Sequence, residues 1–140
     1  MANGSDLLIY SDGGSRGNPG PSAIGFLVCD GKGKVLTRHG EYVGIHTNNQ
    51  SEYMALIRAL ENALTYSHGR VHCFLDSELV VKQLNGEYEV RDSNLHTLLL
   101  KVKGLEKKFG SVKYSYVPRN IGKLSIADGL VNKALDSKLK

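Results

Sequence analysis

The apolar positions in the first third of the chain fall in short, β-rich runs. These runs cover residues 7–10, 23–29 and 35–43, and the segment "DGKGK" at 30–34 separates the last two. Runs of this length are typical of strands, and the separating segment favours a hairpin turn. We therefore expect the chain to begin with three strands.

From residue 53 onward the apolar period changes to that of a helix. Apolar residues recur three and four positions apart until "SHGR" at 67–70, at Tyr53, Leu56, Ile57, Leu60, Ala63 and Leu64. Further along, the pattern predicts strands at 71–75 and 112–117, and helices at 77–84, 95–109 and 124–139. This order indicates an α/β fold, a mixed sheet with helices packed on its faces. We expect one domain covering residues 1–140.

Composition and charge narrow the class of protein without naming a function. With 140 residues, 41% of them hydrophobic and 23% charged, the chain has an ordinary globular composition. It contains no apolar run long enough to span a membrane, and "MANGSDLLIYSDGG" does not resemble a secretory signal. We therefore expect a cytoplasmic protein. We also expect a monomer, although no feature of the sequence specifies the oligomeric state. The net charge of +4 suits a polyanionic partner, but it fits a solvated lysine-rich helix equally well.

The cysteines and histidines do not form a recognisable reactive motif. Cys29 and Cys73 both lie within apolar runs and outside any C-x-x-C motif, which favours small buried side chains over redox or metal roles. None of the five histidines pairs at the spacing of zinc ligands, and no G-x-S-x-G motif occurs. Zinc chemistry and a nucleophilic serine are therefore unsupported.

The stretch "YSDGGSRGNPGPSAIG" at 10–25 is rich in glycine and proline. Its glycines lack the spacing of the dinucleotide and P-loop motifs, and its prolines oppose the helix that such motifs require. The simplest interpretation is a flexible connection of about ten residues between two strands, with Asp12 as a turn residue.

Four carboxylates each have an ordinary explanation as well as a functional one. Asn49 and Glu52 have the spacing of a capping box, Asp76 precedes a predicted helix as an N-cap would, and Asp128 could be solvated. However, Asp12 and Asp76 each follow an apolar strand run, where ligands of mixed sheets gather. Glu52 and Asp128 lie near the inward stripes of their helices.

These carboxylates would form one cluster if the first and fourth strands were neighbours. Asp12 and Asp76 would then lie about 5 Å apart, and the helices that carry Glu52 and Asp128 could close over them. Such a cluster cannot stay ionised without cations, and Mg²⁺ prefers this kind of oxygen ligand. Two such ions about 3.5–4 Å apart can promote phosphodiester hydrolysis.

Four segments taken in order closely resemble the signatures of type 1 ribonuclease H. They are "YSDGGSRGNPGPSAIG", "TNNQSEYMAL", "LDSELVVKQLNGEY" and "IADGLVNKAL", and the match covers residues 6–136. The resemblance implies a ribonuclease H-like fold, a five-stranded mixed sheet of order 3-2-1-4-5 with helices on both faces. It also implies an endonuclease that hydrolyses the RNA strand of RNA/DNA hybrids with Mg²⁺ or Mn²⁺, leaving 5′-phosphate and 3′-hydroxyl ends.

The same resemblance assigns roles to individual residues. It implies that two metal ions are held by the catalytic carboxylates Asp12, Glu52, Asp76 and Asp128. It implies contacts with the nucleic acid from Gly13, Ser15, Arg16, Asn18, Thr47, Asn48, Asn49 and Arg119. The paired amides Asn48 and Asn49 suit the wide minor groove of an RNA-containing duplex, where 2′-hydroxyls are exposed.

The chain departs from many bacterial members of that family in two places. The short "NGEYEVRDSN" stands where they carry a basic, tryptophan-bearing protrusion, and the chain has no Trp, so it resembles the compact, archaeal-like form. Substrate binding would then either be weaker or rely on the basic segment 101–108. The loop "VPRNIGKLSIAD" lacks the usual histidine, for which Arg119 is the expected substitute, and Leu124 replaces a frequent asparagine.

Two alternative functions remain open on these residues. One is a catalytically silent module that binds hybrids or double-stranded RNA, and the other is a nuclease that also cleaves double-stranded RNA.

The implied strand order further places Cys29 and Cys73 on either side of the first strand, roughly 10 Å apart. This separation exceeds the reach of a disulfide, so we expect free thiols.

Overall fold

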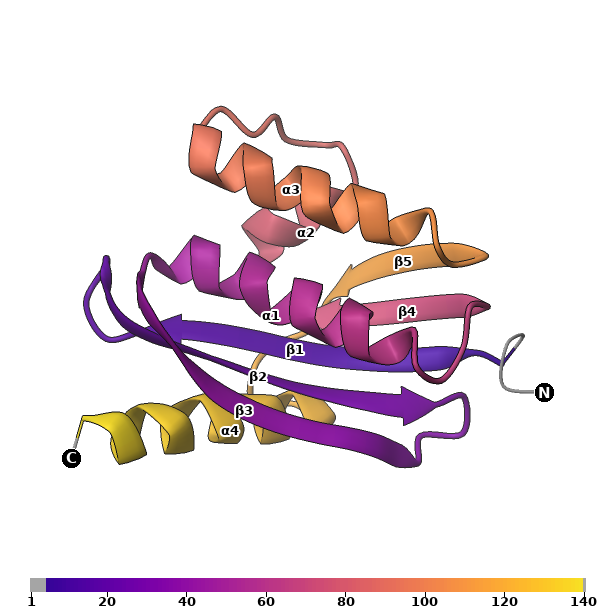
Figure 1. The fold of residues 1–140 in the computed structure, drawn as a ribbon, viewed down its shortest axis with the longest axis horizontal. Helices are drawn as coiled ribbons and strands as arrows, with labels where there is room; N and C mark the ends of the chain where they lie inside the picture. The colour runs from indigo at the N-terminus through magenta and orange to yellow at the C-terminus, as the bar shows by residue number, and fades with distance from the viewer. Residues whose placement is uncertain (1–4, 140) are drawn as a thin grey trace.

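The structure, a computed structural model, describes residues 5–139 and contains one five-stranded sheet of order β3-β2-β1-β4-β5 (Figure 1). The elements in chain order are β1 (Leu7–Ser15), β2 (Gly20–Asp30), β3 (Val35–His46), α1 (Asn48–Ala63), β4 (Arg70–Leu75), α2 (Glu78–Leu84), α3 (Ser93–Glu106), β5 (Ser111–Tyr116) and α4 (Lys123–Lys138). The predicted strand order and mixed sheet are confirmed.

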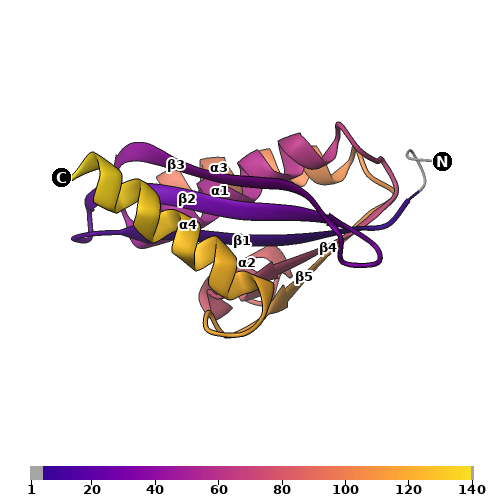
Figure 2. The same ribbon diagram turned by 90° about the horizontal axis from the view of Figure 1, so that it is seen from below.

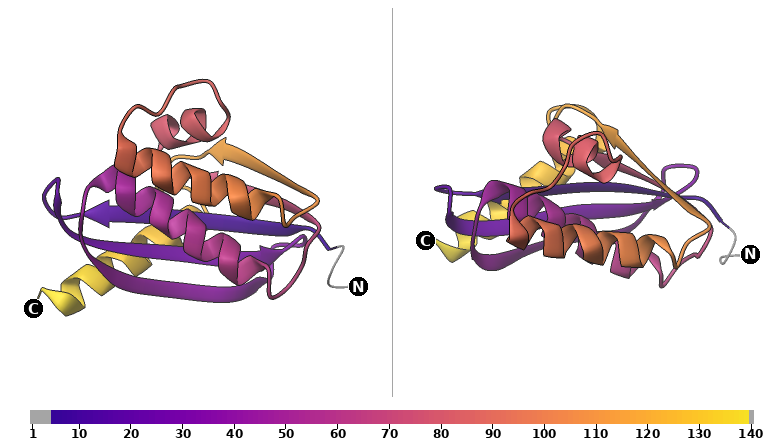
Figure 3. Two further views of the ribbon diagram at one scale, coloured as in Figure 1. Left: turned by 45° about the horizontal axis from the view of Figure 1, so that its top comes forward. Right: turned by 90° about the horizontal axis from the view of Figure 1, so that it is seen from above.

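Helices cover both faces of the sheet. α1 and α3 pack side by side on one face, as both views of Figure 3 show. α4 lies on the opposite face, where it packs against β1, β2 and β3 (Figure 2). The larger apolar core fills the space between the sheet and the first three helices. On the other face, Ala23 of β2 packs with Val131 and Leu135 of α4 in a smaller apolar cluster.

The central strand β1 is longer than its parallel neighbour β4. β1 pairs antiparallel with β2 along its whole length, but its pairing with β4 ends where Ser11 lies beside Leu75. Asp12 is therefore the first residue of β1 beyond the end of β4, and Asp76 follows that end directly. The strand register alone brings these two carboxylates to one place.

The glycine-rich segment differs from its expected form as a long flexible connection. β1 continues through Ser15 and β2 begins at Gly20, so only residues 16–19 form the turn. The glycines are instead required by close packing. A Cβ atom at Gly13 would overlap the backbone of Ser51 in α1, and one at Gly25 would overlap that of Ala127 in α4. The absence of side chains lets both helices approach the central strands.

Two expected helix caps are wrong. α1 is capped by Thr47, which accepts a hydrogen bond from the backbone N–H of Gln50, while the Gln50 side chain accepts one from the Thr47 N–H. The capping box therefore precedes the predicted Asn49 pair by two residues, and Glu52 plays no part in it. α2 is capped by Ser77 rather than Asp76.

The α3 boundaries also differ from the apolar pattern. Asp92 caps α3 by accepting a hydrogen bond from the Leu95 N–H, so the helix starts two residues before the predicted position 95. It ends at Glu106 rather than at residue 109, because the chain then turns toward β5 with Phe109 buried in the core.

Both cysteines are buried and free, as predicted. Cys29 lies beside Leu8 and Cys73 beside Ile9, on opposite sides of β1. Burial raises the pKa of both thiols, which keeps them protonated at neutral pH. Within residues 5–139 no helix has the length and apolar character needed to cross a membrane.

Candidate active site

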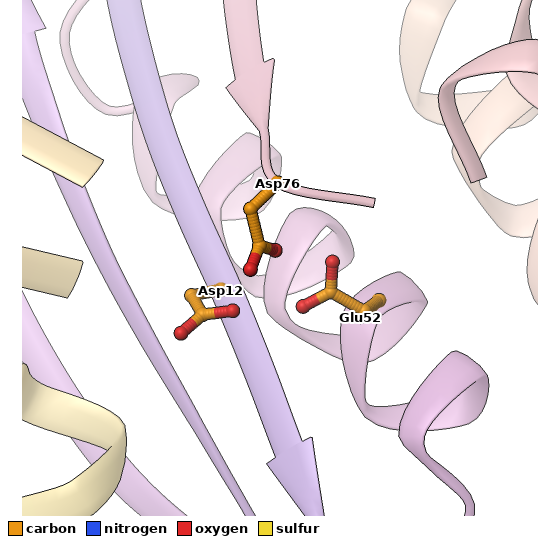
Figure 4. Close-up of side chains that lie close together, drawn as sticks. All are labelled: Asp12, Glu52 and Asp76. Atoms are coloured by element: carbon orange, nitrogen blue, oxygen red, sulfur yellow. The ribbon is translucent and has the colours of Figure 1, made fainter. Parts of the chain in front are cut away.

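Three carboxylates from three different elements converge beside the end of β4 (Figure 4). Asp12 comes from β1, Glu52 from the first turns of α1, and Asp76 from the residue after β4. One oxygen of each lies within 4.8 Å of the others. The side chains are almost fully enclosed, because Asp12 is 1% exposed and Glu52 is 5% exposed.

The position of Glu52 is fixed by a hydrogen bond to the neighbouring strand. The backbone N–H of Gly13 donates to Glu52 Oε1. This contact requires α1 to lie directly against β1, which the missing side chain of Gly13 permits. Asp12 and Glu52 are therefore held close together, because Asp12 directly precedes Gly13 on β1 and Glu52 lies on the helix that packs against this strand.

The cluster is electrostatically unfavourable when all its members are ionised. Burial, followed by the charge of Asp76, raises the pKa of Asp12 to about 8. Burial and the charge of Asp12 raise the pKa of Glu52 well above its usual range. Three buried oxygens, Asp12 Oδ1, Glu52 Oε2 and Asp76 Oδ1, have no hydrogen-bond partner among the described residues. Unpartnered buried carboxylate oxygens of this kind fit a hard divalent cation such as Mg²⁺ or Mn²⁺.

Arg119 provides a positive charge at the open side of this cluster. Its Nε lies 2.5 Å from Asp76 Oδ2 and 3.4 Å from Asp128 Oδ1, and its Nη2 lies 3.7 Å from Asp12 Oδ1. The guanidinium comes from the loop between β5 and α4, and its side chain is 55% exposed. The positive group expected near the carboxylates is thus present in the protein itself.

Asp128 lies further out than the other three carboxylates. Its side chain is 29% exposed on α4, and it joins the cluster across Arg119. Asn132, one helical turn later, donates a hydrogen bond of 3.4 Å to Asp128 Oδ2. Sequence reasoning missed Asn132, although its spacing of four residues from Asp128 is the signal that would have indicated it.

A cleft of about 460 Å³ opens over the carboxylates, and much of its lining comes from the residues expected to contact nucleic acid. Besides the four carboxylates, its lining includes Gly13, Ser15, Arg16, Asn48, Asn49 and Arg119. The N-terminus of α1 also faces the cleft, and the positive end of its helix dipole favours a phosphate.

Asn18 and Thr47 do not line this cleft but hold its rim. Asn18 Oδ1 accepts a hydrogen bond from the Asn48 N–H at 3.0 Å, and Asn48 Oδ1 accepts one from the Ser15 N–H at 2.8 Å. Thr47 caps α1 immediately before these amides. The turn after β1 and the start of α1 are therefore joined through Asn48.

The comparisons with known proteins agree with this geometry. The family model described as "Reverse transcriptase-like" matches residues 10–134. The structure of RNase H1 from the archaeon Halobacterium salinarum is 39% identical, with a TM-score of 0.89 over 94% of this chain and 98% of that one. LC11-RNase H1, solved in complex with an RNA/DNA hybrid, is 38% identical, with a TM-score of 0.89 over 96% of this chain and 99% of that one.

The chain belongs to the type 1 ribonuclease H family. The N-terminal RNase H domain of a Mycobacterium tuberculosis protein is also similar, at 34% identity and a TM-score of 0.91 over 96% of both chains. Several of the curated relatives are longer than this chain. It spans 66% of the Halobacterium salinarum "Ribonuclease HI" and 36% of the Mycobacterium tuberculosis "Bifunctional protein Rv2228c".

Ser15 and Arg16, which were both expected to contact nucleic acid, each bond to another part of the protein. The Ser15 hydroxyl is directed to backbone carbonyls, including that of His46 at 2.8 Å, so its contribution to the cleft is mainly backbone. Arg16 forms an ion pair with Asp136 of α4 at 2.6 Å, with both side chains largely exposed. Because exposed pairs contribute little stability, Arg16 can exchange this partner for a phosphate.

The basic segment 101–108 is only partly available to a ligand. Lys103 is turned toward the protein, where its Nζ donates to the Leu84 carbonyl at 2.7 Å and lies 3.0 Å from Glu106 Oε2. Lys101, Lys107 and Lys108 remain exposed. Of the four lysines of this segment, three therefore present their charge to solvent.

Proposed function

We propose that this chain is an endoribonuclease that hydrolyses the RNA strand of RNA/DNA hybrids, with Asp12, Glu52, Asp76 and Asp128 holding two Mg²⁺ or Mn²⁺ ions. The observation that carries the proposal is the convergence of three buried carboxylates with unpartnered oxygens at the floor of a cleft. The similarity of this chain to LC11-RNase H1, which was solved in complex with an RNA/DNA hybrid, supports RNA/DNA hybrids as the substrate.

The protein positions each group for phosphodiester hydrolysis. Asp12, Glu52 and Asp76 supply the enclosed ligand oxygens, and Asp128 supplies one at the open side of the cleft. Divalent ions held by these residues would stabilise the negative charge on the attacking and leaving oxygens. Attack of a water on the phosphorus with departure of the 3′ oxygen would leave 5′-phosphate and 3′-hydroxyl ends. The charge of Arg119 lies beside the same oxygens and can balance a phosphate that leaves the site.

The amides at the start of α1 select the substrate. The Asn48 side-chain oxygen is held by the Ser15 N–H, which orients its NH₂ group. Asn48 and Asn49 both line the cleft, where they can contact 2′-hydroxyls in the minor groove of a hybrid. Thr47 and the α1 N-terminus lie beside them to receive the adjacent phosphate.

A catalytically silent hybrid-binding module is the second candidate. The observation that favours it is Arg119, which pairs with Asp12, Asp76 and Asp128 and offsets part of their negative charge without any metal ion. In such a module the carboxylates would have only a structural role, and binding would not require a divalent ion.

Cleavage of an end-labelled RNA/DNA hybrid distinguishes these functions. Double-stranded RNA and DNA duplexes are tested alongside, each with Mg²⁺, Mn²⁺ or EDTA. We expect metal-dependent cuts in the RNA strand of the hybrid, no cleavage by Asp76→Asn, and unchanged cleavage by Glu61→Gln, which neutralises an exposed acid on α1. Hybrid binding without cleavage under either metal would establish the silent module, and cuts in double-stranded RNA would widen the substrate class.

A further inference from the structure

The face of the sheet that carries α4 is only partly covered. α4 packs against β1, β2 and β3, and in Figure 2 the strands β4 and β5 extend to one side of it. Side chains alternate along these strands, and Ile9, Cys73 and Tyr114 belong to the core on the α1 side. The residues next to these in each strand therefore project from the other side of the sheet, which α4 leaves uncovered here.

Three aromatic rings form an ordered row on this uncovered part. Tyr10 of β1 and Phe74 of β4 stack with ring centroids 4.9 Å apart and planes 14° apart. His72 stacks on Phe74 at 4.1 Å and 25°, and its Nε2 lies 2.7 Å from the hydroxyl oxygen of Ser115 in β5. All three rings are only half-buried. The three rings thus hold one another in place, with Phe74 stacked on both of the others and each residue partly exposed.

Two lysines lie at opposite sides of this row. Lys113 on β5 lies close enough to His72 to help burial lower the pKa of that ring. Lys123, at the start of α4, lies beside Cys29 and the hairpin at Gly33. Neither lysine forms an ion pair within residues 5–139. We call this surface, formed by Tyr10, His72, Phe74, Lys113 and Lys123, the aromatic sheet face.

The acidic residues nearby are already engaged. Asp6 forms an ion pair with Arg70 at 2.9 Å, whereas Asp30 accepts hydrogen bonds only from the backbone N–H groups of Lys32 and Lys34 and keeps its negative charge. Lys113 and Lys123 outweigh this single charge, so the aromatic sheet face has a net positive charge, which is complementary to a polyanion.

The aromatic sheet face is continuous with the candidate active site. Tyr10 precedes Asp12 by two residues on β1, and Phe74 precedes Asp76 by two residues at the end of β4. Residues two apart on a strand project from the same side of the sheet, so Tyr10 lies roughly 6–7 Å from Asp12, while Asp76 lies directly beyond the end of β4. The row of rings therefore begins next to the carboxylates and leads away from them along the sheet.

We propose that the aromatic sheet face binds an unpaired, single-stranded extension of the nucleic-acid substrate, an inference that rests on the proposed function. Aromatic rings flanked by cations recognise single strands without sequence preference, because every base has a π-face and every nucleotide a phosphate. A protein partner is less suited to this surface. Two of the large apolar side chains that the protein exposes, Ile45 on β3 and Leu100 on α3, belong to elements that do not form this face.

The test compares a blunt RNA/DNA hybrid with hybrids that carry an unpaired RNA tail of about six nucleotides at the 5′ or 3′ end, a length within one single-strand site. Binding is measured by fluorescence anisotropy in EDTA, which prevents cleavage. We expect a tail at one end to tighten binding about tenfold, the effect of one base–aromatic stack. Phe74→Leu and the exposed variant Lys113→Gln should each remove most of this gain and leave binding of the blunt hybrid unchanged.

Tyr88→Leu, which removes an exposed ring from the loop before α3, is the matched control and should retain the gain. The inference is wrong if neither tail tightens binding to the wild type, or if Phe74→Leu and Lys113→Gln weaken blunt and tailed hybrids equally. Cleavage of the blunt hybrid by the wild type in Mg²⁺ tests the proposed function separately. Tail-dependent binding without that cleavage would overturn the nuclease and retain the aromatic sheet face.

Discussion

The substitution Asp12→Asn is expected to stabilise the metal-free protein at pH 8. Asp12 is 1% exposed, and burial together with the charge of Asp76 raises its pKa from 3.8 to about 8. Between these two values the unfolded chain has released a proton that the folded protein keeps. Stability therefore falls as the pH rises from about 4 to 8. Asparagine has no proton to release and removes this dependence.

The size of the effect follows from the pKa of Asp12. Because a tenfold change in proton affinity corresponds to about 1.36 kcal/mol, the rise to about 8 has an upper bound of roughly 5 kcal/mol at pH 8. The variant also loses the attraction between Arg119 and Asp12, whose charged atoms lie 3.7 Å apart. We therefore expect a net gain of about 2–3 kcal/mol.

Denaturant unfolding in EDTA, followed by circular dichroism at pH 4.5 and pH 8, measures this gain. The gain should shrink by more than half at pH 4.5, where Asp12 of the folded wild type is protonated. Glu61→Gln removes an exposed acid from α1 and should change stability by less than about 0.5 kcal/mol at either pH. Equal stability of Asp12→Asn and the wild type at pH 8, or a gain independent of pH, would refute the reasoning.

Three further predictions concern other parts of the site and its support. Arg119→Gln should tighten Mg²⁺ binding severalfold in titration calorimetry, because the guanidinium competes for the carboxylate oxygens; weaker binding would show that it assists the metal instead. Gly13→Ala should destabilise the protein by about 3 kcal/mol in denaturant unfolding, because its Cβ overlaps the backbone of α1. Gly104→Ala, in an open position of α3, should be neutral or stabilising by up to about 1 kcal/mol; equal losses at the two glycines would contradict the packing argument. Tyr53→Phe should cost about 1–2 kcal/mol in the same assay, because its hydroxyl donates to the buried Gln83 side chain at 2.7 Å; no loss would mean that Gln83 finds another donor.

The sequence alone predicted the type and order of most elements, because apolar periods survive wherever an element has one buried face. The helical stripe from Tyr53 to Leu64 corresponds closely to α1, and the run at 71–75 is β4 almost to the residue. The strand order came from the resemblance to type 1 ribonuclease H, since pairing between distant strands leaves no local signal. The structure confirms that order.

The errors arose where tertiary contacts override local preference. Asp12 was expected as a turn residue and the glycines after it as part of a flexible connection, yet Asp12, Gly13 and Gly14 all continue β1. The helices on both faces need the space that side chains at the two glycines would fill. Asn49 and Thr47 are both good N-cap residues, and only the Thr47 hydroxyl reaches the Gln50 N–H. The contacts of Arg119 with three carboxylates depend on the path of a loop, which its sequence does not specify.

Because β1 extends beyond the end of β4, the sheet has a gap beside β1 at the candidate active site. Beyond Leu75 the central strand has lost its parallel neighbour, and the N–H of Gly13 bonds instead to the carboxylate of Glu52. A side chain thus takes the place of a backbone carbonyl from a strand that stops short. Lengthening β4 by even two residues would close this gap and displace Glu52. The β2–β3 hairpin lies on the other side of β1 and takes no part in this gap, whereas the residue at which β4 ends decides whether Glu52 can reach Gly13.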